Sequence, residues 1–570
     1  MINKLIGFVF LTFLAPYCFS QTITWSFETI QPKEKNVFTG ISFPGTDQSS
    51  YYINESDAGG VSINRTKRNY MKVIDKHSLS LKKEIALEED LMADAKTYDN
   101  VRSFILNNKK FYFFIDKEEK DIFNVSGAVQ NFDGKITTPL KSLQNIDISK
   151  ARQFASSASP LANKWSKGEI RMHASTYINI KPSFDNKTII SAFITKSTDE
   201  DYSMLNISEW NEDLKNIVSN DYKIVFHARQ NKQKTIFGKM GTSSGIHPMI
   251  WDVVKDKNGF VYVLVKSANP KNEEDAGLYS VYQFKTADPS YIKIFKKEFT
   301  KNIATVQADF FQDETGKVYV SNIGLEIEDE KDKDEHYYVN SAVIGSFNND
   351  GTLETIFAKQ LSAEMMYNFE TEKEVDKKGH INSLRIKNIL PAADGSTYVV
   401  WQHEWSEYKE TANGGSNAYY NYDNLLVQCY GKTKKILWEK PIYKRQVQKN
   451  VLSGSYADIC LFTQNDNLYI IYGDDAKNAE KQMEDKNVAQ FSVVKFNDKD
   501  LAGFSLITLK PNGNSTKKYL KWPADKIGFG LNVRSIKPIG NNEYIGTARK
   551  ISQGAITIKS EEYAVFKLKL

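Results

Sequence analysis

Cysteine is scarce in this sequence, with only 3 among 570 residues. Cys18 lies close to the N-terminus, so only Cys429 and Cys460 fall in the main body of the chain. An exported protein could join these two in a disulfide, provided that their Cα atoms lie within about 7 Å of each other. Both cysteines stand in strand-like runs, so a disulfide and a pair of buried free thiols both stay open.

An excess of charge of one sign is also missing. The chain has 75 Lys and Arg against 70 Asp and Glu, a net charge of +5, and the two signs are mixed along its length. Without a basic block, nothing indicates a nucleic-acid partner. Beyond the first twenty residues, no stretch has the about 20 consecutive apolar residues that a membrane-spanning helix needs, so we predict no transmembrane span.

Catalytic and cofactor motifs are missing as well. No phosphate-binding or dinucleotide-binding motif occurs, and no histidine pair has metal-ligand spacing. Gly241–Gly245 fits Gly-x-Ser-x-Gly, but a strand-like run follows it where a nucleophile elbow needs a helix. Asp329–Glu335 is acidic but lacks the central glycine of a calcium loop. We therefore predict no cofactor and no metal, and we leave open whether the chain is an enzyme.

The first twenty residues have the features of a secretory signal peptide. Lys4 supplies the positive charge, Leu5–Leu14 the short apolar run, and Pro16 and Ser20 the end of the segment. We predict cleavage after residue 20, which leaves a mature domain of residues 21–570 in the periplasm, on the outer surface or outside the cell.

One pattern recurs eight times in the mature chain: an apolar strand, a tight polar turn, and a second strand that contains a large residue, usually tyrosine. Clear copies are Arg102–Asp116 (RSFILNNKKFYFFID), Asp252–Lys266 (DVVKDKNGFVYVLVK) and Asp309–Asn322 (DFFQDETGKVYVSN). Turn pairs such as Asn-Gly and Asp-Gly favour hairpins. The large residues recur about every 70 residues, which is long enough for four strands and their loops. They are Tyr52, Tyr112, Ile189, Tyr262, Tyr319, Tyr398, Tyr469 and Tyr544.

A second strand pair follows most hairpins, as in Asn424–Tyr430 and the segment after it, or Val488–Phe496 and Gly503–Leu509. The last repeat has a third strand, Tyr563–Leu570, and then the chain stops. Ile23–Ile30 (ITWSFETI) supplies a spare strand at the other end of the mature chain.

This organisation resembles a β-propeller, in which one end of the chain completes the blade made by the other. The resemblance implies an all-β fold made of one propeller of eight four-stranded blades, or seven if Phe38–Ile53 is not a blade. The signatures of WD40, kelch and sialidase repeats are not present in the sequence.

The longest connections of such a ring fall on one face, and loops on a rigid scaffold commonly carry function. They include Ser362–Gly379, His403–Asn421 and Asp474–Asn487. The opposite face has mostly short turns. We therefore predict that this long-loop face binds the partner.

Charged residues recur where the innermost strands begin. Arg102, Asp252, Asp309 and Arg534 each stand ten residues before a repeat landmark, and Asp458 stands eleven before one. Equal spacing predicts equal orientation on the pleated strand, near the mouth of the central channel. Two interpretations follow: an anion site that contains the two arginines, or charge pairs that tie neighbouring blades together.

Aromatic residues gather in the sixth repeat. Trp and Tyr at a surface are typical of sugar stacking and of protein contacts, although strand residues of the group could equally pack in the core. The group flanks a Gly-Gly-Ser-Asn tip and comprises Trp401, Trp405, Tyr408, Tyr419, Tyr420 and Tyr422. Three histidines precede innermost strands: His173, His247 and His380. They could converge on a metal or act as a base, but histidines that are satisfied or exposed fit the sequence better, because their spacing matches no metal-ligand motif.

The sequence thus predicts a non-catalytic binding or assembly protein of a bacterial cell envelope, with a protein or polysaccharide partner. The alternative is a propeller-type polysaccharide lyase or glycoside hydrolase that acts at the channel mouth. Its candidate residues, chosen from position alone, are His173, His247, Asp252 and Asp309. Neither the ligand nor the oligomeric state follows from the sequence.

Expression of the full chain in a bacterial host tests the predicted export. N-terminal sequencing of the protein recovered from the periplasm or medium should begin at Gln21, because signal peptidase cuts after a small residue such as Ser20. An N-terminus at Cys18 that carries lipid would contradict this cleavage site.

Overall fold

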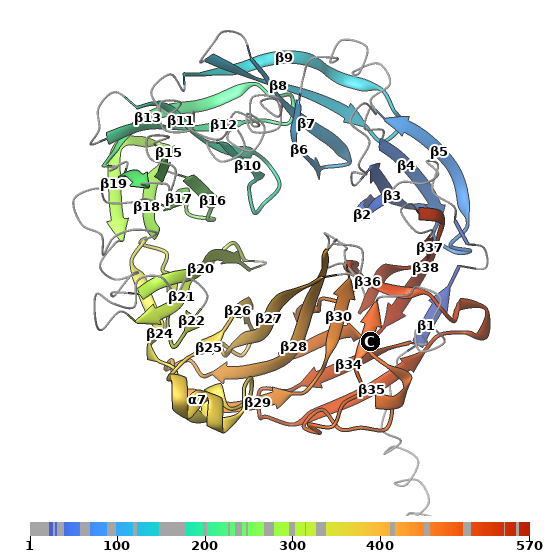
Figure 1. The fold of residues 1–570 in the computed structure, drawn as a ribbon. Helices are drawn as coiled ribbons and strands as arrows, with labels where there is room; N and C mark the ends of the chain where they lie inside the picture. Colours follow the sequence, from blue (N-terminus) through green and yellow to red (C-terminus); the bar gives the residue numbers. More distant parts are fainter. Residues whose placement is uncertain are drawn as a thin grey trace, which may run out of the picture.

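A computed structural model of the chain shows a ring of β-sheets (Figure 1). The structure describes residues 22–26, 29–30, 39–57, 69–87, 99–117, 122–147, 178–197, 202–225, 229–233, 242–246, 249–266, 279–295, 303–313, 315–326, 338–410, 416–449, 457–493, 503–540, 542–553 and 558–570.

Eight four-stranded antiparallel sheets follow one another around this ring, one for each sequence repeat. The first four sheets comprise, from the innermost strand outward, β2 Thr39–Thr46, β3 Ser50–Asp57, β4 Asn69–Asp75 and β5 Leu81–Leu87; β6 Asp99–Leu106, β7 Lys109–Lys117, β8 Ile122–Asn131 and β9 Ile136–Asp147; β10 Ile178–Pro182, β11 Ile189–Ser197, β12 Tyr202–Trp210 and β13 Asn216–Val225; β16 Met249–Lys255, β17 Phe260–Lys266, β18 Tyr279–Lys285 and β19 Asp288–Phe295.

The other four sheets are built in the same way. They comprise β20 Ile303–Gln312, β21 Val318–Glu326, β23 Ser341–Phe347 and β24 Leu353–Gln360; β26 Leu384–Pro391, β27 Thr397–Glu410, β28 Ser416–Tyr430 and β29 Ile436–Ile442; β31 Cys460–Gln464, β32 Asn467–Gly473, β34 Gly503–Leu509 and β35 Ser515–Lys521; β36 Gly530–Gly540, β37 Glu543–Gln553, β38 Ile558–Lys569 and β1 Thr22–Trp25. Three short pairings lie outside this pattern: β14 Arg229–Gln233 with β15 Thr242–Ile246, β22 Tyr338–Val339 with β25 Ile381–Asn382, and β30 Gln446–Lys449 with β28 and β33 Phe491–Val493.

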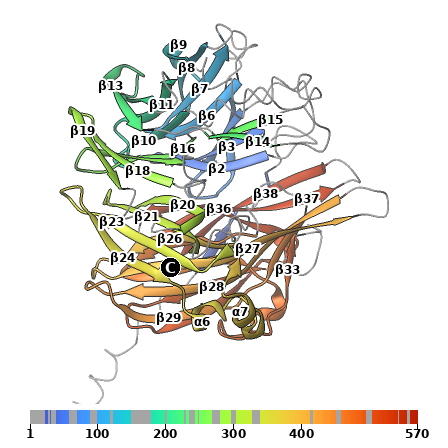
Figure 2. The same ribbon diagram turned by 60° about the vertical axis from the view of Figure 1, so that its left-hand side comes forward.

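The innermost strands lie side by side around the centre of the ring. Each contacts the innermost strand of the next sheet, and β36 of the last sheet contacts β2 of the first, so the circle is closed. The second view, turned by 60°, shows the sheets one behind another around the same ring (Figure 2). The predicted single all-β propeller is therefore confirmed. Phe38–Ile53, the segment on which the predicted number of blades depended, contributes β2 and the start of β3.

Local turn chemistry sets the register of each inner hairpin. In the fourth sheet the carboxylate of Asp256 accepts hydrogen bonds from the backbone N–H groups of Asn258 (2.8 Å) and Phe260 (2.9 Å). Gly259 adopts φ +84°, which costs glycine little and other residues more. The second sheet instead turns through Asn107 and Asn108, both with positive φ, as a two-residue hairpin requires.

The repeat landmarks form the core between neighbouring sheets. The Tyr262 ring packs against Phe347 of the fifth sheet, with centroids 4.1 Å apart, while its hydroxyl donates to Asp256 (3.2 Å). The apolar body of tyrosine thus fills the gap between two sheets, and its polar tip is satisfied by the adjacent turn. Six of the landmarks are buried: Tyr112, Ile189, Tyr262, Tyr319, Tyr398 and Tyr544.

The N-terminal strand completes the last sheet, as the sequence predicts. β1 pairs antiparallel with β38, and Trp25 lies opposite Phe566. An isolated bridge between Ile30 and Tyr563 extends the pairing beyond the end of β1. The Trp25 ring meets Trp522 of the seventh sheet edge-on, with centroids 4.6 Å apart. The first strand of the described chain therefore joins the last two sheets.

A buried polar cluster joins the last sheet to the first. The Tyr563 hydroxyl donates to Glu55 (2.5 Å), and Lys72 pairs with Glu55 (3.0 Å) and Glu84 (3.1 Å). Lys72 and Glu55 are each 1% exposed, so each charge depends on the other. Burial, and then the nearby Glu55 carboxylate, raise the pKa of Tyr563 well above its ordinary value.

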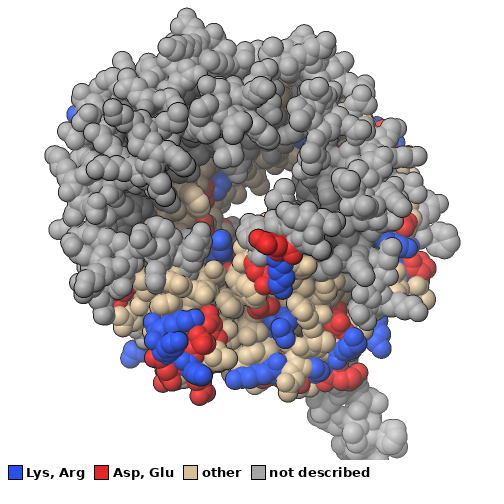
Figure 3. All heavy atoms as spheres, in the orientation of Figure 1, with Lys and Arg blue, Asp and Glu red and all other residues tan. Residues whose placement is uncertain are grey.

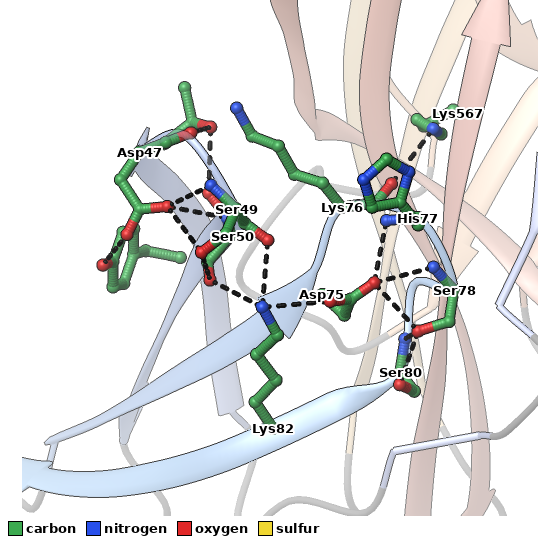
Figure 4. A network of polar contacts seen from close by, with 12 residues as sticks. Asp47, Ser49, Ser50, Asp75, Lys76, His77, Ser78, Ser80, Lys82 and Lys567 are labelled. Atoms are coloured by element: carbon green, nitrogen blue, oxygen red, sulfur yellow. Dashed lines mark hydrogen bonds and ion pairs between the residues drawn. The ribbon is translucent and has the colours of Figure 1, made fainter.

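A second set of polar contacts lies at the turns of the first sheet (Figure 4). The Lys82 ammonium group pairs with Asp75 (3.0 Å) and donates to the backbone oxygen of Ser49 (3.1 Å). From the last sheet, Lys567 donates to the backbone oxygen of Lys76 (3.2 Å). These contacts hold the turn after β2 against the turn after β4 and attach both to the closing sheet.

One predicted strand is wrong. Val488–Phe496 is not the third strand of the seventh sheet, because β33 within it pairs in parallel with β30 of the sixth sheet. The outer pair is β34 and β35, joined by a turn at Asn512–Gly513. The sequence did not indicate β35 as a strand, because β35 is polar and most of its residues are exposed or half-buried at the rim of the ring.

Two predicted loops are regular structure. Ser362–Gly379 contains the short helices α6 (Ala363–Met366) and α7 (Glu372–Lys378). Hydroxyl groups of Ser362 and Thr371 cap their N-termini, and Gly379 ends α7 in the left-handed conformation. His403–Asn421 is mostly a continuation of β27 and β28 beyond the other sheets. No helix in the described part of the chain is long and apolar enough to cross a membrane.

Cys429 and Cys460 are free thiols, which settles the question left open by the sequence. Cys429 is buried, and burial raises the pKa of its thiol to about 11. Burial likewise raises the pKa of Cys460 to about 12.

Replacement of Trp25 by Ala tests the closing strand. We expect the free energy of unfolding to fall by about 2–4 kcal/mol, because the substitution removes ring contacts between the N-terminal strand and two sheets. Urea denaturation at pH 7 measures the change. The control is Ile294→Ala on β19, where the side chain is 44% exposed and a loss within about 0.5 kcal/mol is expected. Equal losses for both variants would show that the strand does not close the ring.

Candidate functional site

A pocket of about 1350 Å³ opens beside the extended hairpin of the sixth sheet. Its lining combines the middle of β27 and of β28, Asn382 of β25, the start of β26, the segment between α6 and α7, and the connection after β29. The pocket lies on the long-loop face, and α6 and α7 belong to one of the connections of that face. The hollow is lined by aromatic rings, amide groups and charges of both signs.

A β-bulge in β28 lies beside the pocket. Gln402 pairs with Leu425 and Glu404 with Tyr422, so the single residue His403 of β27 faces two residues of β28, Asp423 and Asn424. Beyond the bulge, Trp405 lies directly opposite Asn421, and opposite residues of an antiparallel pair share one face. The indole Nε1 donates to Asp423 (2.9 Å), which lies two residues along β28 on that same face.

Three polar atoms in this pocket are buried and have no hydrogen-bond partner among the described residues: His403 Nε2, Asn421 Nδ2 and Asn382 Oδ1. His403 is 9% exposed and Asn421 is 5% exposed. We call these three residues the polar floor. Leaving such a group without a partner costs about 1–3 kcal/mol, so each one points to a ligand or another function.

His403 is neutral at pH 7, because burial lowers its pKa below the ordinary value despite nearby carboxylates. Its hydrogen bond to the backbone of Asn382 raises the pKa, as a bond donated by the ring does. Since Nε2 has no partner, the donating nitrogen is Nδ1, and Nε2 is a bare acceptor in the pocket.

The segment between α6 and α7 forms the wall opposite the hairpin. The Phe369 ring approaches His403, with centroids 6.4 Å apart, and Glu370 accepts a hydrogen bond from the backbone N–H of Asn382 (3.3 Å). Asn424 at the base of the hairpin donates to the backbone oxygen of Asn368 (3.1 Å). The wall is therefore fixed to both β25 and β28.

A chain of charges begins at Glu404 and Arg385 in the pocket lining and continues to the neighbouring sheets. Glu404 pairs with Arg385 (3.6 Å) and Lys387. Lys387 also pairs with Asp458 of the seventh sheet (2.8 Å), which in turn pairs with Arg534 of the eighth (3.4 Å). Three sheets are thus linked at the channel end of the pocket.

Lys444 is buried beneath this chain, with 1% exposure. Its ammonium group donates to the backbone oxygen of Tyr422 and to the side-chain oxygen of Gln446, both at 2.6 Å. The side-chain amide of Gln446 donates in turn to the backbone oxygen of Gly473 in the seventh sheet (2.7 Å). Lys444 is thus linked to that sheet through Gln446. Burial lowers the pKa of Lys444 to about 7.

The structure brings part of the predicted aromatic group into the pocket. Trp405, Tyr420 and Tyr422 line it, whereas Trp401 is fully buried and belongs to the core between sheets. Tyr419 lies on β28 opposite Glu407, outside the pocket lining, and the backbone of Tyr408 lies opposite Ala418.

The predicted charges at the channel mouth lie between neighbouring sheets. Asp252 pairs with Lys181 of the third sheet, and Asp309 accepts a hydrogen bond from the Trp251 indole of the fourth (3.4 Å). Arg534 pairs with Asp458, as described above. For these residues the contacts fit the tying interpretation, because each links one sheet to another.

Equal sequence spacing does not give equal register at Arg102. Asp252 and Asp309 lie opposite the residues two positions after their landmarks, whereas Arg102 lies opposite Phe113, one position after Tyr112. The two-residue turn of the second sheet shortens its hairpin, so the predicted common orientation fails there. Of the predicted histidines, His173 and His247 lie outside the described residues, and the His380 ring contacts Tyr338, with centroids 4.0 Å apart.

Sequence reasoning missed the amide groups of the polar floor. Asn382 precedes the sixth inner strand, and Asn421 follows two tyrosines, but neither stands in a recognisable motif. Ser243 is also not a nucleophile elbow, because it lies within β15, which pairs with β14. No group of three or more His, Cys, Asp or Glu suited to a metal occurs among the described residues. Positive and negative side chains are interspersed over the described part of the face in Figure 3.

No protein-family model matches the sequence, and no curated protein matches it either. The WD40 domain of SCAP from fission yeast is similar over 96% of this chain and 98% of that one, at 8% identity and a TM-score of 0.33. The alpha-L-arabinanase of Penicillium chrysogenum is similar over 81% of this chain and 91% of that one, at 10% identity and a TM-score of 0.26. The GH93 alpha-L-arabinofuranosidase of Fusarium graminearum is similar over 68% of this chain and 92% of that one, at 9% identity and a TM-score of 0.26. Likenesses this weak carry no argument about function.

The pH dependence of stability tests the state of Lys444. Its pKa is about 7 in the folded chain and about 10.4 when unfolded, so the unfolded chain binds more protons between these values. The stability contributed by this group should therefore rise as pH increases from 7 to 10. We measure the free energy of unfolding of the wild type and of Lys444→Met by urea denaturation. Between pH 7 and pH 10 the wild type should become more stable relative to the variant. A difference that stays constant would mean that Lys444 is charged throughout.

Proposed function

We propose that the chain is an exported, non-catalytic binding protein of a bacterial cell envelope, and that the sixth-sheet pocket holds its ligand. The observation that carries the proposal is the polar floor, because buried hydrogen-bonding atoms without partners are retained where a ligand satisfies them. The partner classes are those predicted from the sequence, a polysaccharide or a protein of the envelope. The N-terminal segment supports export.

The surroundings of the pocket favour binding over chemistry. Trp405 is fixed by its bond to Asp423, and the hairpin is held on both faces by contacts with other elements. Such a prearranged surface loses little entropy when it binds. Arg385 in the lining is paired with Glu404, and among the described residues His403 Nε2 has no partner with which it could exchange a proton.

A glycoside hydrolase or lyase at the channel mouth is the second candidate, and one observation favours it. Asp309 is a carboxyl group whose pKa is raised by burial, while Asp252 on the neighbouring sheet is paired with Lys181. Glycoside hydrolysis uses two carboxyl groups in different environments, and these two lie on neighbouring sheets. Trp251 between them is 44% exposed and could contact a sugar.

Matched tryptophan substitutions separate the two sites. Residues 21–570 are incubated with envelope material from the organism that produces the chain, and bound protein is measured by co-sedimentation. Trp405→Ala should weaken binding about tenfold, because it removes the main aromatic contact of the pocket. Trp251→Ala, on the same face, should leave binding unchanged.

The enzyme alternative predicts the opposite pattern. Binding would then depend on Trp251, and new reducing or unsaturated sugar ends would appear with the wild type but not with Asp309→Asn. Binding that neither tryptophan affects would contradict both candidate sites.

A further inference from the structure

The polar floor presents one donor and two acceptors to the pocket. Asn421 Nδ2 can only donate, while His403 Nε2 and Asn382 Oδ1 can only accept in the states described above. A ligand that satisfies all three must donate twice and accept once over a short distance. Hydroxyl groups do both, since each has one hydrogen and two lone pairs.

A flat aromatic surface lies next to these polar atoms. Trp405 shares the face of Asn421, and its Nε1 is already bonded to Asp423, so the indole contributes its ring and no free donor. An aromatic face beside hydrogen-bonding groups suits a sugar ring, which has an apolar face of C–H groups and a rim of hydroxyls. An extended peptide could form hydrogen bonds with the polar floor, but its binding would not require the aromatic ring of Trp405.

Charges of both signs line the pocket, but those that act on His403 are carboxylates. The groups whose charges act on His403 are Asp423, Glu370 and Glu404. An anionic ligand at His403 would be repelled by these carboxylates, and Arg385, which also lines the pocket, is paired with Glu404 (3.6 Å). An ammonium group would be attracted, but it has no lone pair for the donor of Asn421.

We propose that the pocket recognises an uncharged sugar residue with neighbouring hydroxyl groups. Two hydroxyls donate to His403 Nε2 and Asn382 Oδ1, an oxygen accepts from Asn421 Nδ2, and Trp405 contacts the apolar face of the ring. This inference rests on the proposed function and names its ligand class.

Chemically modified envelope polysaccharide tests the ligand class. The same co-sedimentation assay uses four preparations: untreated, protease-treated, carboxyl-reduced, and oxidised with periodate, which cleaves neighbouring hydroxyls. Binding that depends on Trp405 should survive protease and carboxyl reduction and be lost after periodate. Loss after protease would identify a protein partner, and loss after carboxyl reduction an acidic sugar. Survival after periodate would show that neighbouring hydroxyls are not recognised. Each of these three results overturns the inference but leaves the binding function standing.

Substitution of the single donor tests the polar floor itself. Asn421→Asp keeps the size of the side chain and replaces the donor by an acceptor, so affinity for untreated polysaccharide should fall more than tenfold. The control, Asn417→Asp, makes the same charge change on β28 outside the pocket lining and should bind like the wild type. Thermal unfolding of both variants verifies that they are folded. A folded Asn421→Asp variant with unchanged affinity would overturn the proposed contact. If Trp405→Ala also leaves binding unchanged, the pocket is not the binding site, and the proposed function itself is wrong.

Discussion

Closure of the ring is the constraint on which the rest of this structure depends. An array of antiparallel sheets that did not close would expose the faces of its first and last members and leave an open strand edge. Here β1 completes the last sheet, and the buried cluster of Lys72, Glu55 and Tyr563 joins that sheet to the first. The cluster uses charges that are stable only together, so its geometry specifies which two sheets meet.

The closed ring also explains how polar residues can be placed near its centre. Innermost strands begin with a bulge or an irregular pair in several sheets, and residues there contact the neighbouring sheet as well as their own. Lys387 reaches Asp458, and Gln307 exchanges two hydrogen bonds with the backbone of Ile386. Side chains that look like a charged site in the sequence thus have a structural use at the channel mouth.

The sixth sheet differs from the others because its middle strands continue beyond the ring. Contacts on both sides stabilise this extension: α6 and α7 with their connecting segment on one side, and Lys444 with β30 on the other. The cost is a concentration of buried polar groups, from Lys444 to the polar floor. Such groups reduce stability where they have no partner, and they provide hydrogen bonds to a ligand without rearrangement.

The sequence by itself determined the architecture. Strand and turn patterns are local, so the period of the repeat, the landmark Tyr262 with its Asp256 turn, and the spare strand at Ile23–Ile30 predicted the propeller and its closure. The aromatic residues Trp405 and Tyr420 were found for the same reason. Only the tertiary structure decided that Asn382, His403 and Asn421 meet, because that depends on a one-residue bulge and on a segment brought in from the connection before β26. It also decided that Arg102 departs from the common register, since a turn two residues long reverses the side of the strand on which a residue falls.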